Sequence, residues 1–260
     1  MSKKDTLNPY RFSLYQLYNR FIWDLNPKSF LERKKIRNLK NKYAGEKAII
    51  MCNGPSLNEV NFDLLKDCYI FGLNKINLLF KRTTMRPNFI VATNMHVVSQ
   101  NAEFFNTTDI DLFIDSKAFR KRLLKRRNNI FYIHSALIPG FAKDCSISIN
   151  PSHTVTNTTL QLAYHMGFSK IAIVGADHEF AVKGSPNSYV SGIKEDNSHF
   201  DKSYFADVEW QLPDLIESEV GYLRARSCFE NDNREIYNCT VGGKLEIFKR
   251  LELSEFLASK

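Results

Sequence analysis

Short apolar runs alternate with longer amphipathic segments over most of the chain, and this rhythm gives the first structural prediction. Short runs bounded by Gly, Pro or Asn are typical of strands that are buried on both faces of a sheet. They fall at residues 47–52, 69–73, 88–93, 110–114, 129–133, 170–175 and 234–238. Helical periodicity covers 9–24, 28–43, 58–66, 96–105, 116–127 and 154–166. The alternation predicts an α/β domain with a mostly parallel sheet and helices on both faces.

Three consecutive predicted strands are each followed by an asparagine: Asn53, Asn74 and Asn94. The first lies in the turn Asn53-Gly-Pro-Ser-Leu, whose Gly54 and Ser56 are common turn residues. Ligands bind where the carboxyl ends of parallel strands meet, so these amides are expected to converge on a site. An amide offers two donors and an acceptor without charge, which suits ribose, a base edge or a phosphate oxygen. One such turn alone would predict only a tight bend, and the repetition favours nucleotide binding.

Two further segments carry candidate binding residues. Thr156 and Asn157 lie where a polar loop enters a predicted helix, so they either cap this helix or help its free N–H groups to bind an anion. Asp177 follows the strand at 170–175 and either binds ribose hydroxyls or caps its own loop. The chain lacks the glycine patterns of NAD sites and of P-loops, which argues against hydride transfer and P-loop kinase chemistry.

Residues 178–207 break the alternation, because they are rich in Gly, Pro, Asn and Ser and have weak apolar periodicity. A loop of this length in a compact domain is usually a functional lid or a disordered segment. Its aromatic residues favour the lid. His199 in this segment is a candidate general base, because a histidine titrates near neutral pH and two lid tyrosines are near it in sequence.

Composition narrows the class of protein. The 260 residues are 43% hydrophobic and 25% charged, which is typical of a globular domain with a well-buried core. Five scattered cysteines without a C-x-x-C argue against a disulfide framework or a structural zinc site, and indicate a reducing cytoplasm. No apolar run approaches the roughly 20 residues of a membrane span, and no secretory signal is recognised.

The net charge of +8 is concentrated in basic runs at 33–42 and 120–127. Such runs are typical of solvent-exposed helix faces, and they also suit binding of an anionic substrate or of an anionic membrane surface. No nucleic-acid-binding module is recognised, so we expect no nucleic-acid partner. The aromatic segment 10–23 precedes the first basic run and fits either an interfacial helix on a membrane or packing on the domain. We therefore predict a helical extension at 1–45 and a nucleotide-sugar-binding domain at 46–260.

Several of these features, taken in order, resemble the small bacterial lipooligosaccharide sialyltransferases. The features are Asn53-Gly-Pro-Ser-Leu, Asn74, Asn94, the Thr156-Asn157 loop, Gly175-Ala-Asp177, Tyr189 and Asp196-Asn-Ser-His199-Phe. The resemblance covers about residues 46–240. It implies a single Rossmann-like domain of the GT-A variant with a lid, and transfer of sialic acid from CMP-sialic acid without a metal or another cofactor.

The resemblance also implies roles for individual residues. His199 would be the general base on the acceptor hydroxyl, and Tyr189 would hydrogen-bond the departing phosphate. Residues implied to hold the nucleotide and its sugar are Asn53, Gly54, Ser56, Asn74, Asn94, Thr156, Asn157 and Asp177. The chain departs from that family at His153-Thr-Val-Thr-Asn157 and at His178-Glu-Phe180, which leaves the donor sugar open.

A second resemblance is to the pterin pyrophosphokinase-like proteins and the motility-associated factors that glycosylate flagellin with nonulosonic acids. It is carried by the same strand and Asn-Gly-Pro-Ser-Leu turn and by segments 236–243 and 251–257. Both resemblances are satisfied by an inverting glycosyltransferase that moves a nonulosonic acid from a CMP-sugar to a cell-surface glycan, as in lipopolysaccharide or capsule biosynthesis. The alternatives are a magnesium- and ATP-dependent diphosphotransferase and a non-catalytic nucleotide-binding protein.

The aromatic segment and the basic run after it also predict a location. We expect the protein at the cytoplasmic face of the bacterial inner membrane, bound peripherally, with a lipid-linked or lipid-anchored glycan as acceptor. The sequence leaves homo-oligomerisation open.

Overall fold

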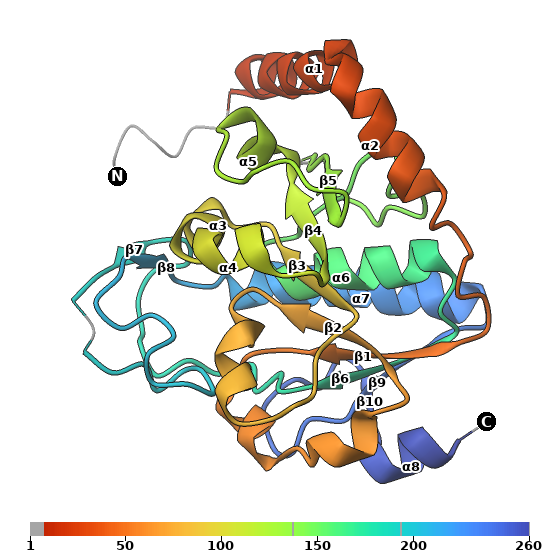
Figure 1. Cartoon of the computed structure of the whole chain (residues 1–260), viewed down its shortest axis with the longest axis vertical. Helices are drawn as coiled ribbons and strands as arrows, with labels where there is room; N and C mark the ends of the chain where they lie inside the picture. The colour runs from red at the N-terminus through yellow and green to blue at the C-terminus, as the bar shows by residue number, and fades with distance from the viewer. Residues whose placement is uncertain (1–7, 137, 193, 260) are drawn as a thin grey trace.

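The apolar runs of the sequence form the strands of one parallel sheet (Figure 1). The computed structural model describes residues 8–136, 138–192 and 194–259. In this part of the chain the eight-stranded sheet has the order β10-β9-β6-β1-β2-β3-β4-β5, with every pairing parallel. Its strands are β1 Lys47–Met51, β2 Tyr69–Leu73, β3 Phe89–Ala92, β4 Asp111–Asp115, β5 Ile130–Ile133, β6 Lys170–Val174, β9 Glu235–Asn238 and β10 Lys249–Arg250. The predicted α/β class and all seven predicted strands are confirmed.

Both faces of the sheet are buried, as the unbroken apolar runs predict. Successive residues of a strand point to opposite faces, so Ile49 and Met51 belong to one hydrophobic cluster, and Ala48 and Ile50 to the other. All four side chains are fully buried. On one face α6 and α7 lie side by side, as Figure 1 shows. The other face is covered by the short helices between β1 and β5 and by α8.

The strand order reverses between β1 and β6. From β1 the chain continues through β2, β3, β4 and β5 toward one edge, and then crosses to β6 on the other side of β1. Such a reversal leaves a crevice at the carboxyl ends of the two central strands, which is where ligands bind in open α/β sheets. Asn53 follows β1 and Asp177 follows β6, so the topology places both residues at this crevice.

The helices are α1 Pro9–Leu25, α2 Pro27–Arg37, α3 Met95–Gln100, α4 Ala102–Thr107, α5 Ser116–Arg120, α6 Val155–Met166, α7 Leu215–Asn231 and α8 Leu253–Ala258, with 3-10 turns η1 Pro55–Glu59, η2 Phe62–Leu65 and η3 Ile76–Lys81. Four predicted helices are shorter or broken. The segment 58–66 forms η1 and η2, and 96–105 is divided into α3 and α4 at Asn101. The helix predicted at 116–127 ends at Arg120 because Arg122 takes a left-handed φ of 54°. Helix α2 ends at Arg37, and turns continue to residue 45.

Helix α7 was not predicted, and its inward face explains the miss. The residues that it buries include Ser218, Gly221 and Ala225, which do not produce an apolar stripe in the sequence. Gly221 is required because a Cβ there would lie 2.6 Å from the Cβ of Ser152. The helix therefore packs closely on the loop before α6 through small side chains. Helix α8, strand β10 and the hairpin of β7 Tyr189–Val190 and β8 Trp210–Gln211 were also not predicted.

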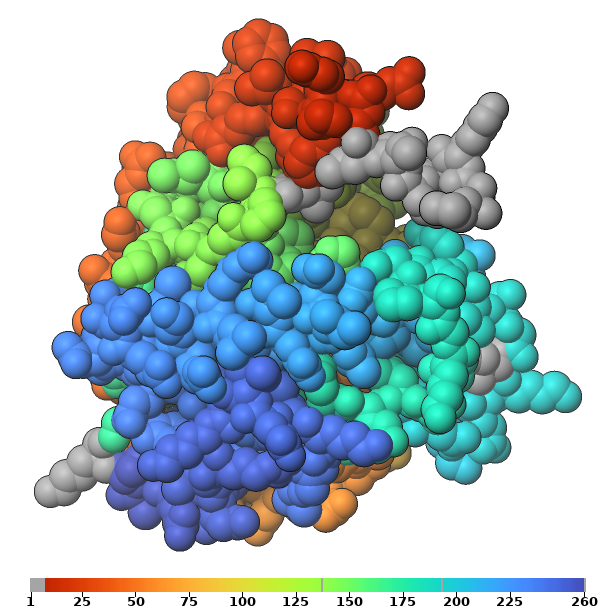
Figure 2. Space-filling model, turned by 180° about the vertical axis from the view of Figure 1, so that it is seen from behind, coloured from red at the N-terminus to blue at the C-terminus, as the bar shows by residue number. Residues whose placement is uncertain are grey.

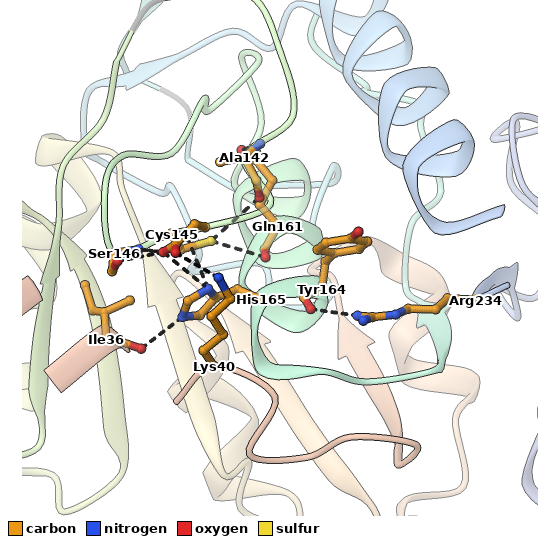
Figure 3. A network of polar contacts seen from close by, with 10 residues as sticks. Ile36, Lys40, Ala142, Cys145, Ser146, Gln161, Tyr164, His165 and Arg234 are labelled. Carbon is orange, nitrogen blue, oxygen red and sulfur yellow. Dashed lines mark hydrogen bonds and ion pairs between the residues drawn. The ribbon is translucent and has the colours of Figure 1, made fainter. Parts of the chain in front are cut away.

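Helix α2 packs on the edge strand β5, and α1 packs on α2. Trp23 and Ile36 are buried, each in one of the two hydrophobic clusters. His165 of α6 connects three segments (Figure 3): its Nε2 lies 2.9 Å from the carbonyl of Ile36, and its Nδ1 lies 3.3 Å from the backbone N–H of Cys145. The inward faces of α1 and α2 therefore belong to the core of the domain.

Candidate functional site

The carboxyl ends of the strands open into a cavity of about 800 Å³. One wall, which we call the sheet wall, consists of the strand ends and the first turn of α6. The rest of the lining comes mainly from the described part of the lid, residues 178–207, and from residues 210–224, which include Trp210 and the first turns of α7. The predicted site residues that line the cavity are Asn53, Gly54, Asn74, Asn94, Thr156, Asp177 and His199. Tyr189, Ser56 and Asn157 are not part of the lining.

The turn after β1 is fixed by hydrogen bonds to the loop after β6. Gly54 donates its N–H to the carbonyl of Gly175 at 2.8 Å. The backbone N–H and the hydroxyl of Ser56 donate to the Asp177 carboxylate at 3.1 and 2.7 Å. A Cβ at Gly54 would lie 1.9 Å from Asp177 Oδ2, so only glycine fits there. Ser56 thus stabilises the turn without lining the cavity, and Asp177 links the loop after β6 to the turn after β1.

The three asparagines lie on the sheet wall with different local roles. The Oδ1 atom of Asn53 is buried and accepts no hydrogen bond from the described residues, which leaves this acceptor for a ligand. Asn74 takes a left-handed φ of 52°, a conformation that asparagine tolerates. The side chain of Asn94 caps α3 by accepting from the N–H of His96 at 2.8 Å. Asn94 is therefore a helix cap as well as a lining residue.

Helix α6 begins at the cavity. Thr154 is its N-cap, and the Thr154 hydroxyl accepts from the N–H of Thr156 at 3.3 Å. A helix start of this kind presents N–H groups and a positive dipole end to an anion. Asn157 is fully buried, and its Nδ2 donates to the carbonyl of Asn150, so it holds the loop before α6. The structure thus places Thr156 at the cavity and Asn157 behind it.

His199 and Asp196 form the most distinctive pair at the cavity. His199 Nδ1 lies 2.7 Å from Asp196 Oδ2, and the side chains are only 11% and 3% exposed. The imidazole stacks on Tyr204 with ring centroids 4.2 Å apart, and Phe205 and Trp210 meet it edge-on. A carboxylate at Nδ1 selects the tautomer with the proton on Nδ1, so that Nε2 is an acceptor.

Lys75 joins the two walls of the cavity. It follows Asn74 on the sheet side, and its Nζ donates to the carbonyl of Tyr204 in the lid at 2.7 Å. Nζ also lies 4.7 Å from the centroid of the Phe205 ring. Burial lowers the pKa of Lys75 to about 8, although the nearby Asp196 carboxylate opposes the shift. Sequence reasoning missed both Lys75 and the role of Asp196, although an Asp three residues before the candidate base was a usable signal.

A tyrosine, two basic residues and a cysteine also lie in or near the cavity, and they differ in their possible chemical roles. Tyr189 is 55% exposed in β7, with its ring 5.3 Å from that of His96, so the structure does not bring it to the cavity with His199. Lys117 and Arg224 line the cavity and supply positive charge that sequence reasoning did not assign. Burial raises the pKa of Cys52 to about 12, so this thiol stays neutral and is a poor nucleophile.

Comparison with known proteins places the chain in a family. Residues 25–183 match the model of the family described as 6-hydroxymethylpterin diphosphokinase MptE-like. The chain belongs to the MptE-like family. The matched region contains Asn53, Thr156 and Asp177 and ends before His199, so the family match covers the sheet wall and not the catalytic candidate of the lid.

Part of a longer protein of known structure has a similar fold. The MAf glycosyltransferase from Magnetospirillum magneticum AMB-1 superposes with a TM-score of 0.50 and 15% sequence identity. The similar region covers 86% of this chain and 38% of that one, so the chain spans well under half of its structural neighbour. At this identity the likeness shows a Rossmann-like fold of the kind found in a glycosyltransferase. No curated protein matches the sequence.

Proposed function

We propose that this MptE-like protein is a metal-independent inverting glycosyltransferase that moves a nonulosonic acid from a CMP-sugar donor to a cell-surface glycan. The fold shared with a solved glycosyltransferase supports the reaction class. The cavity is large enough for a nucleotide-sugar and lies at the strand-order reversal, where nucleotides bind in open α/β sheets. The donor and the acceptor class come from the sequence resemblance.

The observation that carries the proposal is the His199–Asp196 pair at the cavity. Asp196 orients the imidazole through Nδ1, and Nε2 takes the proton of the acceptor hydroxyl. The freed acceptor oxygen forms a bond to the anomeric carbon, while the bond from that carbon to the phosphate oxygen breaks. CMP leaves with the electron pair of the broken bond, and the configuration at the anomeric carbon inverts.

The leaving phosphate gains negative charge, and the cavity lining provides groups that stabilise it. We assign this role to the N-terminus of α6 with Thr156, and to the side chains of Lys117 and Arg224. Asn53 and Asp177 would hold the nucleotide, with Asp177 also keeping the turn in place. Tyr189 is left out of this mechanism because it lies outside the cavity lining.

The family description favours a second candidate, a magnesium- and ATP-dependent diphosphotransferase. Such an enzyme needs carboxylates that can bind magnesium, and Asp177 and Glu179 are the nearest pair in sequence. Asp177 accepts two hydrogen bonds from Ser56, and Glu179 is paired with Lys244 at 2.7 Å. Since both carboxylates already have partners, the transferase is the better-supported candidate.

A thermal shift experiment with CMP, CDP, UDP, GDP and ATP, each with and without magnesium, separates the candidates. A ligand that binds only the folded protein raises its melting temperature. The transferase predicts stabilisation by CMP in the presence or absence of magnesium. An ATP preference that requires magnesium would overturn the proposal in favour of the diphosphotransferase. Binding without any turnover of CMP-sugars would indicate the non-catalytic alternative.

A further inference from the structure

The outward face of α1 is an exposed apolar stripe. Its members are 61–81% exposed and recur at helical spacing: Tyr10, Leu14, Leu17, Tyr18, Phe21 and Leu25. The stripe continues across the bend at Asn26 into Phe30 and Leu31 of α2. Figure 2 shows the N-terminal helices as a red ridge at one end of the molecule, beside a green surface. Contiguous exposed apolar surface of this extent marks an interaction site.

The exposed charges around this stripe are basic. Between residues 8 and 45 the only carboxylates are Asp24 and Glu32. Asp24 is paired with Arg20 and Arg33 at 2.7 and 3.0 Å. Glu32 is buried, where it pairs with Lys35 at 3.3 Å and accepts from the N–H of Tyr132. The two carboxylates offset part of the basic charge, and the segment keeps an excess of Lys and Arg that includes Arg11, Lys28 and Arg37.

The two basic runs of the sequence meet beside the stripe. A groove of about 270 Å³ is lined by four basic side chains and by one carboxylate, that of Glu32, which is paired with Lys35. The basic side chains are Lys34 and Lys35 of α2 and Arg126 and Arg127, which follow α5. Leu31, a member of the apolar stripe, also lines this groove. Apolar and basic side chains thus form one continuous surface, defined here as the α1–α2 face.

We propose that the α1–α2 face binds reversibly to an anionic membrane surface. Apolar and aromatic side chains enter the headgroup region, and the surrounding Lys and Arg attract anionic lipids. Charge decides between this occupant and a second copy of the chain, because a symmetric dimer through this face would bring two basic surfaces together. No helix in the described part of the chain is long and apolar enough to cross a membrane.

The same helix reaches the cavity. Phe12 lies on the inward face of α1 and lines the 800 Å³ cavity, so the stripe and the cavity share one helix. Attachment through the outward face would hold the cavity close to the lipid surface. Resting on the proposed function, this geometry favours an acceptor glycan that is linked to or anchored in lipid, at the cytoplasmic face of the inner membrane.

The test uses the full chain and vesicles of phosphatidylcholine with or without phosphatidylglycerol. We expect cosedimentation with the anionic vesicles and progressive release as salt is added, because salt screens the attraction. The double variant Leu17→Ser/Phe21→Ser should bind at least about 10-fold more weakly, because it removes two exposed apolar side chains that would enter the bilayer. The matched control is Ile216→Ser on α7, which is 75% exposed away from the stripe and should bind like the wild type.

Three results would overturn the proposal: equal binding of the double variant and the wild type, equal binding to neutral and anionic vesicles, or no binding at all. Light scattering without lipid measures the oligomeric state. A dimer in the wild type that is lost in the double variant would show that the α1–α2 face binds a second copy of the chain, which would also overturn the proposal. Urea unfolding checks that the variants are folded. The vesicle assay contains no nucleotide, so its failure and the failure of the proposed transferase are distinguishable.

Discussion

The two walls of the cavity are built in opposite ways. The sheet wall is made of parallel strand ends and a helix N-terminus, and its central turn is fixed by the contacts of Gly54 and Ser56 with the loop after β6. The lid has little regular structure and is held by the rings around His199 and by the Asp196 carboxylate. Regular structure thus provides the binding groups, and an irregular segment provides the candidate base. Substitutions on the two walls should therefore separate binding from turnover.

The largest effect is expected from His199→Ala. Loss of the general base should lower turnover by roughly 100- to 10,000-fold while nucleotide affinity stays nearly unchanged, because the lost group is on the lid and the nucleotide groups are on the sheet wall. Turnover and calorimetric nucleotide binding are the two measurements. His96→Ala, a histidine outside the cavity lining, is the control. Unchanged turnover in His199→Ala would remove this residue from the mechanism.

Asp196→Asn tests how the lid positions its base. The amide keeps the size of the side chain but can donate to Nδ1, which would move the imidazole proton to Nε2 and block proton uptake there. Turnover should fall by about 10- to 100-fold with little change in the KM for the donor. Asp201→Asn is the matched control, because Asp201 is a lid carboxylate that accepts hydrogen bonds from Ser203 and has none with His199 in the described structure. A rise in donor KM without loss of turnover would show a structural role for Asp196.

Asp177→Ala examines the sheet wall. This variant removes both hydrogen bonds that fix Ser56, so the turn that carries Asn53 should loosen and nucleotide affinity should fall about 10-fold, or roughly 1.4 kcal/mol. Isothermal calorimetry with CMP measures the change. Glu179→Ala, two residues further on, removes an exposed carboxylate whose partner is Lys244. Equal losses of CMP affinity in the two variants would show that the affinity depends on the overall negative charge of this loop and not on the hydrogen bonds that fix the turn.

The contrast between the walls also explains which parts could be predicted from the sequence. Residues such as Ile49 and Ile50 face opposite sides of the sheet and are both fully buried, so the strands are visible as apolar runs. Parallel strands end at one edge, which is why Asn53, Asn74 and Asp177 were predicted together and line one cavity. Local pattern and topology were sufficient for this wall.

The lid and α7 depend on contacts that leave no local pattern. Tyr189 was predicted at the site, but it lies in the hairpin of β7 and β8 and is not part of the cavity lining. The contact of Lys75 with the lid carbonyl of Tyr204 joins residues distant in sequence. The Asp196–His199 pair is local, and its spacing of three residues was a usable signal in the lid. Helix α7 buries Ser218, Gly221 and Ala225, whose small size matters only once the neighbouring loop is in place.

The smallest effect is expected at the contact that joins the two walls, in Lys75→Met. Burial lowers the pKa of Lys75 to about 8 in the folded protein, from an ordinary value of 10.5. Between these values the unfolded chain binds more protons, so the wild type gains stability as the pH rises from 8 to 10.5. Below pH 8 this gain is absent, because folded and unfolded chains both carry the charge. The variant should lack this gain, which would be about 3.4 kcal/mol for the full shift and which partial solvation of the amine reduces to about 1 kcal/mol.

Urea unfolding of both proteins from pH 7 to pH 10.5 gives the free energy of unfolding at each pH. The difference between the two curves isolates Lys75, because all other titrating groups are common to both proteins. Lys81→Met replaces an exposed lysine of the same 3-10 turn and should follow the wild type at every pH. Equal pH dependence of the unfolding free energy in Lys75→Met and the wild type would show that the Lys75 amine is not buried against the Tyr204 carbonyl in solution. The lid would then be held to the strand ends by other contacts, such as the hydrogen bond from the Phe200 N–H to the Asn53 carbonyl at 2.9 Å.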